Sequence, residues 1–420
     1  MSSLRLMFIL SVLIAGLPSA LASTIHVPKD QPTIQAGINA ANNGDTVLVA
    51  PGKYVENINF IGKAITVTSS GGAKATVIDG GQVAPVVTFS TGEGLTSVLS
   101  RFTLQNGSST FNSRYDGGGI YISSASPTIR NNIVQNNIAC NGGGGISVEF
   151  GSPLIQANTI RNNSQQSNCS GGVGGGGISV GGAASAAIVG NVIENNTWEG
   201  GGTGFGGGIT LFAAGTPTIE NNIIRRNSAG AFGGSQGGGI WIVNQSDVLI
   251  VQNLIYNNTA GQGGGIYFLV PEGDRGPLLV NNTIVGGPNV VQGSAVFAAG
   301  FDNQVQFFNN LIIGLSGQNA VDCDGTYQQE SPTFTNNDAY SPNGTGLQGT
   351  CVSQGDQNGN ISKNPRFVNP SKRDYQLLAG SPAINAGTNS APDLPKKDLA
   401  GHPRIVGGTI DMAAYEYQGK

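Results

Sequence analysis

The unit that decides the fold spans residues 117–137. It begins with Gly117-Gly-Gly-Ile-Tyr-Ile122 and ends with Pro127-Thr-Ile-Arg-Asn-Asn-Ile-Val-Gln-Asn-Asn137. Its first part alternates apolar and variable residues with period two, which is typical of a strand. Its second part favours two more short strands joined by an asparagine turn, because asparagine tolerates the left-handed backbone of tight turns.

The unit recurs at intervals of roughly 30 residues, which indicates a repeat architecture. Aligned copies put isoleucines in register at Ile120, Ile146, Ile178, Ile209, Ile240 and Ile266, and asparagines at Asn132, Asn158, Asn191, Asn222, Asn253, Asn282 and Asn310. One unit cannot bury a face alone, whereas parallel stacking at about 4.8 Å per coil buries a continuous core. The sequence therefore predicts an all-β, single-stranded parallel β-helix of about ten coils.

Two other repeat folds do not fit this pattern. A β-propeller blade needs about 40 to 45 residues, and a leucine-rich repeat shows leucines at fixed offsets. Composition excludes further classes: the 67 glycines of 420 residues have no three-residue period, which rules out collagen. Charged residues are only 10% of the chain and hydrophobic ones 38%, so charge-driven disorder is excluded. A net charge of -4 gives no reason to expect a nucleic-acid partner.

The N-terminal residues have the pattern of an export signal. A basic Arg5, an apolar stretch and the small-residue pattern Ala20-Leu-Ala22 predict a signal peptide cleaved after Ala22. No later stretch has about 18 uninterrupted apolar residues, so we expect no transmembrane segment and a secreted or cell-surface protein. The four cysteines divide by spacing into two disulfides, Cys140 with Cys169 and Cys323 with Cys351; the alternative is four buried thiols.

Three segments carry a family resemblance. Ile224-Arg-Arg-Asn227 followed by Gly237 to Ile240 resembles the right-handed parallel β-helix repeats of the pectin-lyase-like superfamily, and also those of chlamydial polymorphic outer-membrane proteins. The stretch from Pro32 to Tyr54 is similar to the N-terminal cap and first coil of such proteins, with helical spacing in its first ten residues. The stretch from Asp374 to Glu416 resembles the C-terminal module named choice-of-anchor Q.

The expected order along the chain follows from these segments. Residues 1–22 form the signal peptide, 23–45 an N-terminal cap with a short helix, 46–324 the β-helix repeats, and 325–420 a C-terminal capping or anchor-like region. We expect the last region to cover the open end of the helix, where unpaired strand edges would otherwise invite association.

Few residues are available for catalysis. The only histidines, His26 and His402, lie near opposite ends of the mature chain, which leaves little material for a Ser-His-Asp triad or a histidine-rich zinc site. The motifs of pectin methylesterases and polygalacturonases are missing. One acidic set remains, in the turns after successive glycine-led strands: Asp247, Glu272, Asp274 and Asp302.

Stacking would bring these carboxylates together as an oxygen cage for Ca²⁺, the one cofactor that the sequence suggests. Arg275 would then serve as a base or a substrate clamp. The resemblance implies such use of calcium and a basic residue, as in pectate lyases, without placing it. The alternative interpretation is a set of solvated acidic loop tips.

Two further groups are candidates for binding sugar. Exposed aromatic rings stack on sugars, and the candidates are Tyr121, Trp198, Trp241 and Tyr267; the alternative is that the rings only cover the sheet. Arg161 and Arg225 belong to an outward ladder of Gln135, Arg161, Glu194, Arg225 and Tyr256, which either stabilises the sheet or faces an acidic glycan.

Two functional hypotheses follow. The first is a secreted protein that binds, and as a polysaccharide lyase or glycoside hydrolase cleaves, a polysaccharide or cell-surface glycan along the lateral face of the rod. The second is a non-catalytic structural or adhesion protein of the cell surface. Fold alone does not decide between them, and the sequence leaves the oligomeric state open.

Overall fold

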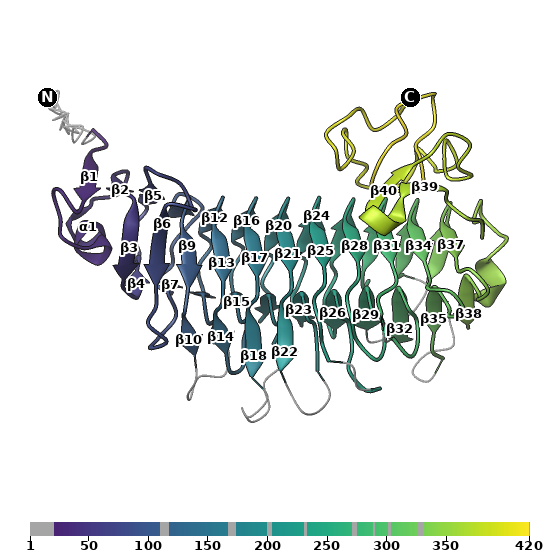
Figure 1. Ribbon diagram of the computed structural model, residues 1–420, viewed down its shortest axis with the longest axis horizontal. Helices are drawn as coiled ribbons and strands as arrows, with labels where there is room; N and C mark the ends of the chain where they lie inside the picture. Colours follow the sequence, from purple (N-terminus) through teal and green to yellow (C-terminus); the bar gives the residue numbers. More distant parts are fainter. Residues whose placement is uncertain are drawn as a thin grey trace, which may run out of the picture.

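Three long parallel sheets form the protein, and we call them sheets A, B and C. The computed structural model describes residues 21–109, 117–166, 174–199, 204–230, 233–270, 275–288, 290–300, 304–325 and 331–419. Within them the chain runs from sheet C to sheet A to sheet B in each coil and then returns to sheet C in the next coil. Figure 1 shows the resulting rod.

The strands of sheet A are β1 (Thr24–Val27), β2 (Thr46–Val49), β5 (Thr66–Ser69), β8 (Val98–Ser100), β12 (Thr128–Arg130), β16 (Leu154–Gln156), β20 (Ala187–Val189), β24 (Thr218–Glu220), β27 (Leu249–Val251), β30 (Leu278–Val280), β33 (Gln306–Phe308) and β36 (Thr333–Thr335). Those of sheet B are β3 (Gly52–Val55), β6 (Thr76–Asp79), β9 (Thr103–Gln105), β13 (Ile133–Gln135), β17 (Thr159–Arg161), β21 (Val192–Glu194), β25 (Ile223–Arg225), β28 (Leu254–Tyr256), β31 (Thr283–Val285), β34 (Leu311–Ile313) and β37 (Asp338–Tyr340).

The strands of sheet C are β4 (Ile58–Asn59), β7 (Val87–Phe89), β11 (Ile120–Ser123), β15 (Ile146–Glu149), β19 (Ile178–Gly181), β23 (Ile209–Phe212), β26 (Ile240–Val243), β29 (Ile266–Leu269), β32 (Val296–Gly300), β35 (Val321–Cys323) and β38 (Leu347–Gly349). A short fourth sheet holds β10 (Ser108–Ser109), β14 (Ile138–Ala139), β18 (Ser164–Gln166) and β22 (Thr197–Glu199). The predicted parallel β-helix is confirmed.

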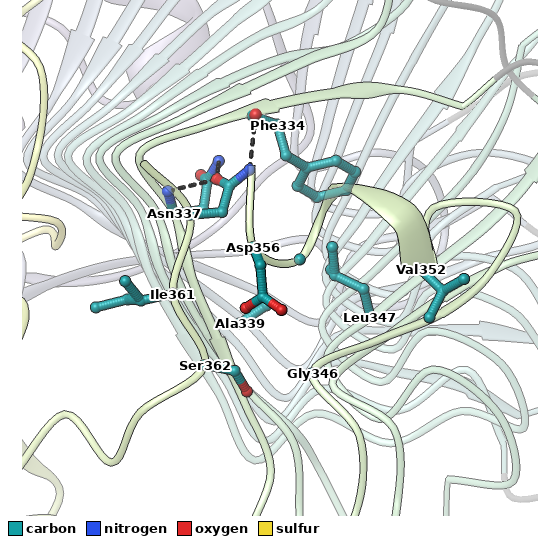
Figure 2. Close-up of a pocket in the computed structure, with 11 residues that line it drawn as sticks. Phe334, Asn337, Ala339, Gly346, Leu347, Val352, Asp356, Ile361 and Ser362 are labelled. Carbon is teal, nitrogen blue, oxygen red and sulfur yellow. Dashed lines mark hydrogen bonds between the residues drawn. The ribbon is translucent and has the colours of Figure 1, made fainter. Parts of the chain in front are cut away.

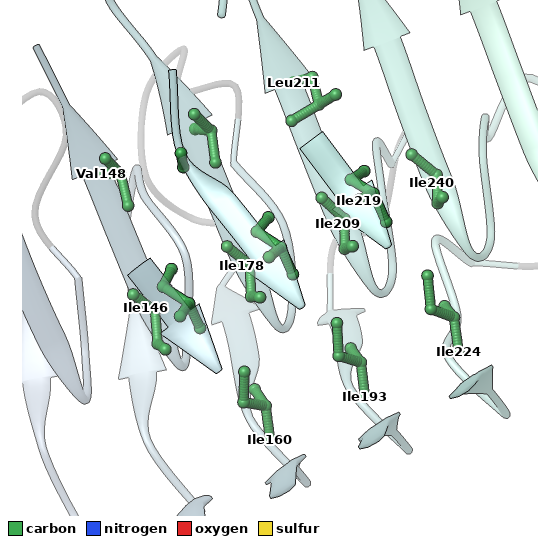
Figure 3. Packing of buried hydrophobic residues seen from close by; sticks show 14 of the residues in the cluster. Ile146, Val148, Ile160, Ile178, Ile193, Ile209, Leu211, Ile219, Ile224 and Ile240 are labelled. Carbon is green, nitrogen blue, oxygen red and sulfur yellow. The ribbon is translucent and has the colours of Figure 1, made fainter. Parts of the chain in front are cut away.

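The core consists of like residues stacked on like. Ile146 pairs with Ile178, and Ile178 with Ile209, in sheet C. Their side chains are fully buried and point into the rod between the sheets (Figure 3). Because each fully buried isoleucine contributes about 1.5 to 3 kcal/mol relative to an exposed one, the stack stabilises neighbouring coils along the whole rod.

Asparagine forms two internal ladders at the corners of the coils. In the first, each side-chain oxygen accepts from the backbone and side-chain nitrogens of the asparagine one coil earlier, as Asn222 does from Asn191 at 2.8 and 3.0 Å. The second ladder, which the sequence analysis did not single out, comprises Asn137, Asn163, Asn196, Asn227 and Asn258. Residues just before the ladder positions adopt positive φ, for example 57° at Asn131 and 53° at Asn136. Both corners therefore bury their polar groups with hydrogen bonds satisfied.

The predicted N-terminal helix is present as α1 (Ile34–Ala40). Thr33 caps it by accepting a hydrogen bond from the Ala36 amide, and the Glu56 carboxylate accepts from the Ile34 and Gln35 amides at 3.0 Å each. A negative charge at a helix N-terminus is favourable, so Glu56 ties α1 to the first coils.

The C-terminal region differs from the prediction. Strands β36, β37 and β38 continue the three sheets, so the repeats extend well past residue 324. Residues 367–419, which we call the C-terminal module, contain the antiparallel strands β39 (Phe367–Asn369) and β40 (Asp374–Leu377) and a 3-10 turn (Pro370–Lys372). Figure 1 shows the module beside the rod, above β28 to β37. The module therefore lies beside the rod, whereas an earlier segment of the predicted capping region 325–420, residues 350–362, approaches the open end.

The module docks on the corner between sheets A and B. The outward side chains of Asn281, Asn309 and Asn336 donate to backbone carbonyls of Asp411, Thr388 and Ala386. Leu311 of the rod packs with Leu377 and Met412 of the module, all buried. The end of the rod is instead approached by residues 350–362, which include a 3-10 turn (Val352–Gln354).

Disulfide-bonded cysteines occur in two parts of the rod. The predicted disulfide between Cys323 and Cys351 is confirmed. Cys140 is also disulfide-bonded, and its predicted partner, Cys169, lies outside the described residues. Within the described part of the chain, no helix is long and apolar enough to cross a membrane.

Candidate functional site

In almost every coil, one side chain on the outer face of sheet C lies between two buried apolar residues of the same strand. Because strand residues alternate between faces, the residue after each core isoleucine points outward. The in-register outer row runs Tyr121, Ser147, Ser179, Thr210, Trp241, Tyr267, Phe297, Asp322 and Gln348. After Tyr121 the row thus changes from small to aromatic to polar residues along the rod.

The aromatic part of this row is buried. Trp241 and Tyr267 are 5% and 3% exposed, and Phe205 and Phe212 pack against the same cluster. The Tyr267 and Phe297 rings stack with centroids 5.7 Å apart, and the Trp241 Nε1 donates to the Gln236 Oε1 at 3.0 Å. Stacking a sugar on Trp241 or Tyr267 would require the neighbouring residues to move, and sugar binding by these rings stays a prediction. Tyr121 and Trp198 are half-buried.

The predicted outward ladder on sheet B is present, and its polar side chains bond one another from coil to coil. Arg161 donates twice to the Gln135 Oε1, at 3.0 and 2.8 Å. Arg225 donates to the Glu194 Oε2 at 2.8 Å and to the Tyr256 hydroxyl at 2.9 Å. These bonds favour the sheet-stabilising interpretation of both arginines over glycan binding.

The structure brings together only part of the predicted calcium cage. The Arg275 guanidinium donates to the Asp247 carbonyl, and the Asp247 Oδ1 accepts from the Gly276 amide at 2.8 Å. Glu272, Asp274 and Asp302 lie outside the described residues, and among the described ones no three His, Cys, Asp or Glu side chains cluster as metal ligands. The Ca²⁺ site therefore stays a prediction.

A hollow that the sequence analysis missed lies at the C-terminal end of sheet C. We call it the acidic hollow; it has a volume of about 480 Å³ and is lined by Gln292, Phe297, Asp322, Cys323, Asp324, Gly325, Gly349 and Thr350. Asp322 and Asp324 flank Cys323, whose side chain is in the core, so both carboxylates belong to the outer face. The Cys323–Cys351 disulfide holds this strand against the segment that contains Thr350.

The electrostatics of the acidic hollow are unusual for this rod. Burial raises the pKa of Asp322, a side-chain hydrogen bond from Asn319 lowers it, and the charge of Asp324 raises it further. The Thr350 hydroxyl oxygen is buried and has no hydrogen-bond partner among the described residues. Gln292, which accepts from the Gln262 Nε2 at 2.8 Å, also lines the hollow. The hollow therefore combines carboxylate, amide and hydroxyl groups beside the Phe297 ring.

A smaller hollow lies on the same face toward the N-terminus. It has a volume of about 150 Å³ and is lined mainly by Ser147, Glu149, Phe150, Ser179, Gly181, Gly182 and Phe212. Phe150 is 59% exposed. A side chain at Gly182 would meet the Phe150 ring at 2.8 Å, so the hollow depends on small residues here. The aromatic cluster separates it from the acidic hollow.

A third hollow, at the C-terminal end of the rod, continues the core. It has a volume of about 160 Å³, and Figure 2 shows Phe334, Leu347 and Ile361 around it with the Asp356 carboxylate. The Phe334 ring stacks on Phe307 at 4.4 Å. This hollow is mostly apolar and marks where the last coil lacks a following one.

The comparisons with known proteins agree on the architecture. Residues 118–312 match the family described as the right-handed β-helix region. The fold is a right-handed parallel β-helix. The crystal structure of the pectate lyase Pel9A is similar, with a TM-score of 0.53 over 91% of this chain and 90% of that one, at 18% identity. No curated protein sequence gives a significant match. At this identity the likeness concerns the fold alone.

Proposed function

We propose that this protein is exported and binds a polysaccharide along the outer face of sheet C, with the acidic hollow as the main contact. The observation that carries the proposal is the pair Asp322 and Asp324 beside the buried Thr350 hydroxyl, which has no partner among the residues that the structure describes. Carboxylates and amides accept and donate the hydrogen bonds that sugar hydroxyls require, and a few polar groups beside an aromatic ring are typical of ligand sites.

The charge of the hollow limits the kinds of sugar that it can bind. Its described lining contains two carboxylates and no lysine or arginine. Desolvating an acidic sugar beside them would be unfavourable, because like charges repel more strongly at low dielectric. We therefore expect neutral or amino sugars here, in contrast to the acidic glycans that likeness to a pectate lyase would suggest.

The binding experiment compares oligosaccharides of glucose, glucosamine and galacturonate by calorimetry. A variant with Asp322→Asn and Asp324→Asn should lose at least tenfold in affinity for the glucose or glucosamine oligomer, because the asparagines keep the volume but accept less strongly. Asp356→Asn, at the end of the rod, is the matched control and should bind as wild type. Equal affinity of the double variant and wild type would remove the hollow from the proposal.

Cleavage is the finer part of the hypothesis, and its discriminating assay is product chemistry. Elimination gives unsaturated ends that absorb in the ultraviolet, whereas hydrolysis gives reducing ends without them. The predicted base, Arg275, donates to the Asp247 carbonyl, while Asp322 and Asp324 supply the pair of carboxyl groups that glycoside hydrolysis uses. We expect reducing ends that Asp322→Asn abolishes; neither product on a bound glycan would favour the non-catalytic adhesion hypothesis.

Export belongs to the same proposal. The signal-peptide pattern of residues 1–22 supports it, and the two disulfide-bonded regions are typical of an oxidising compartment. N-terminal sequencing of the protein from the culture medium should give Ser23 as the first residue. Recovery only from the cytoplasm would contradict this part.

A further inference from the structure

A second cleft lies on another side of the rod, where the C-terminal module meets the corner between sheets A and B. It has a volume of about 590 Å³. The rod contributes Gly190, Glu220, Asn221 and Gln252, and the module contributes residues 395–399 and Gly401. The cleft therefore exists only while the module is docked, and it is remote in sequence from the acidic hollow.

A row of side-chain amides along this corner is interrupted at the cleft. The Gln252 Nε2 donates to the Asn221 Oδ1 at 2.6 Å, and the Asn221 Nδ2 donates to the Glu220 Oε1 at 3.0 Å. The next residue on the same corner is Asn281, but its Nδ2 donates to the module carbonyls of Asp411 and Ala413. Docking of the module thus diverts the donor that would continue the row.

The interruption leaves Gln252 with an unmet acceptor. Gln252 is 1% exposed, and its Oε1 has no hydrogen-bond partner in the part of the chain that the structure describes. A buried acceptor without a donor costs about 1 to 3 kcal/mol. A ligand that supplies an O–H or N–H donor in the cleft would recover that cost.

The module supplies positive charge to the same cleft. Lys396 and Lys397 are exposed and line it, whereas Asp398 is 3% exposed and its two oxygens accept from the His402 and Glu416 amides. The Asp398 charge is therefore directed into the module. The backbone of this loop is fixed, since the Lys396 carbonyl accepts from the amide of the buried Arg404.

We propose that this cleft binds a uronic-acid unit of an acidic glycan. A sugar hydroxyl donates to the Gln252 Oε1, and the uronate carboxylate pairs with Lys396 and Lys397. The site is distinct from the acidic hollow in location, and its lining adds Lys396 and Lys397 to the Glu220 carboxylate, whose Oε1 accepts from the Asn221 Nδ2. A glycan with both neutral and acidic sugars would therefore be held on two sides of the rod. Because the ligand bridges rod and module, binding stabilises the docked module.

The test measures trigalacturonate binding to the full mature chain by calorimetry. Gln252→Asn keeps an amide, suits the φ of 56° at least as well, and withdraws the acceptor from the cleft by one methylene. We expect at least fivefold weaker binding for Gln252→Asn and for the double variant Lys396→Gln with Lys397→Gln. Trigalacturonate should also slow proteolytic removal of the module in wild type and not in either variant.

Two controls separate this inference from the proposed function. Lys372→Gln changes an exposed lysine of the module outside the cleft and should bind trigalacturonate as wild type. Asp322→Asn should leave trigalacturonate binding unchanged, and Gln252→Asn should leave neutral-glycan binding unchanged. Absence of trigalacturonate binding to wild type, or unchanged affinity in Gln252→Asn, overturns the inference whatever happens at the acidic hollow.

Discussion

The coils and the C-terminal module bury polar groups in opposite ways. In the coils, asparagines satisfy one another through copies of one hydrogen-bond pattern, as from Asn191 to Asn222 to Asn253. In the module, Arg404 is 1% exposed and lies among Asp398, Asp411 and Glu416. Periodic self-pairing needs no charge, whereas an aperiodic fold must assemble a specific ionic cluster. The comparison explains why charged residues are only 10% of this chain.

The largest expected effect on stability comes from interrupting an asparagine ladder of the coils. Asn222→Ala removes four hydrogen bonds, two donated by the Asn222 Nδ2 and two accepted from Asn191, within a fully buried corner. At about 1 kcal/mol each plus unsatisfied neighbours, the unfolding free energy should fall by about 5 kcal/mol. Denaturant unfolding followed by circular dichroism measures it. Asn131→Gly, at an exposed positive-φ corner, is the control and should change it by less than about 1 kcal/mol.

The next largest effect comes from removing the cation of the ionic cluster in the C-terminal module. Arg404→Met keeps much of the volume but removes the donors to the Ala413 and Ala414 carbonyls and leaves three acids without their cation. Breaking such a buried cluster costs about 4 kcal/mol. The loss should appear as release of the module to protease while the circular dichroism of the rod persists. If the rod unfolded together with the module, the two regions would be one cooperative unit and the comparison would fail.

The sequence predicted the periodic region better than the rest, for physical reasons. Ile146 and Asn222 could be placed because every coil repeats their environment. Period two predicted the outer face for Trp241, but what covers that face depends on loops of unequal length. Asp322 was missed because its coil follows the weak glycine run near residue 293. The module contact of Asn281 with Asp411 joins residues 130 apart and has no local signal.

A smaller effect tests a single ionisable group inside the periodic region. Asp338 in sheet B is fully buried, and burial raises its pKa to about 7, although its Oδ1 accepts from the Lys363 amide at 2.9 Å. Its Oδ2 has no hydrogen-bond partner within the described ranges. A folded-state pKa above the unfolded value of 3.8 means that the contribution of Asp338 to stability is greatest below pH 4 and is lost as pH rises through 7.

The amplitude of that fall from this group is roughly 4 kcal/mol, because the pKa rises by about three units and one unit corresponds to about 1.4 kcal/mol. Asp338→Asn should therefore remove this part of the decline between pH 4 and pH 8, measured by denaturant unfolding across that range. Asp356→Asn changes an exposed aspartate near the same end of the rod and should retain the wild-type profile. A profile for Asp338→Asn identical to wild type would show that Asp338 is ionised at little cost.

The smallest expected effect on stability comes from removing a charged side chain from the outer face of the coils. It tests whether the coils depend on charge as the module does. Arg161 donates only to the Gln135 Oε1, on a half-buried outer face, and its strand neighbour Glu194 is paired with Arg225 and Arg226 instead. Arg161→Gln should lower the unfolding free energy by less than about 1 kcal/mol, because exposed polar pairs contribute little. A loss as large as that of Arg404→Met would mean that the coils also depend on charge, and the distinction between periodic amide pairing and ionic clusters would not hold.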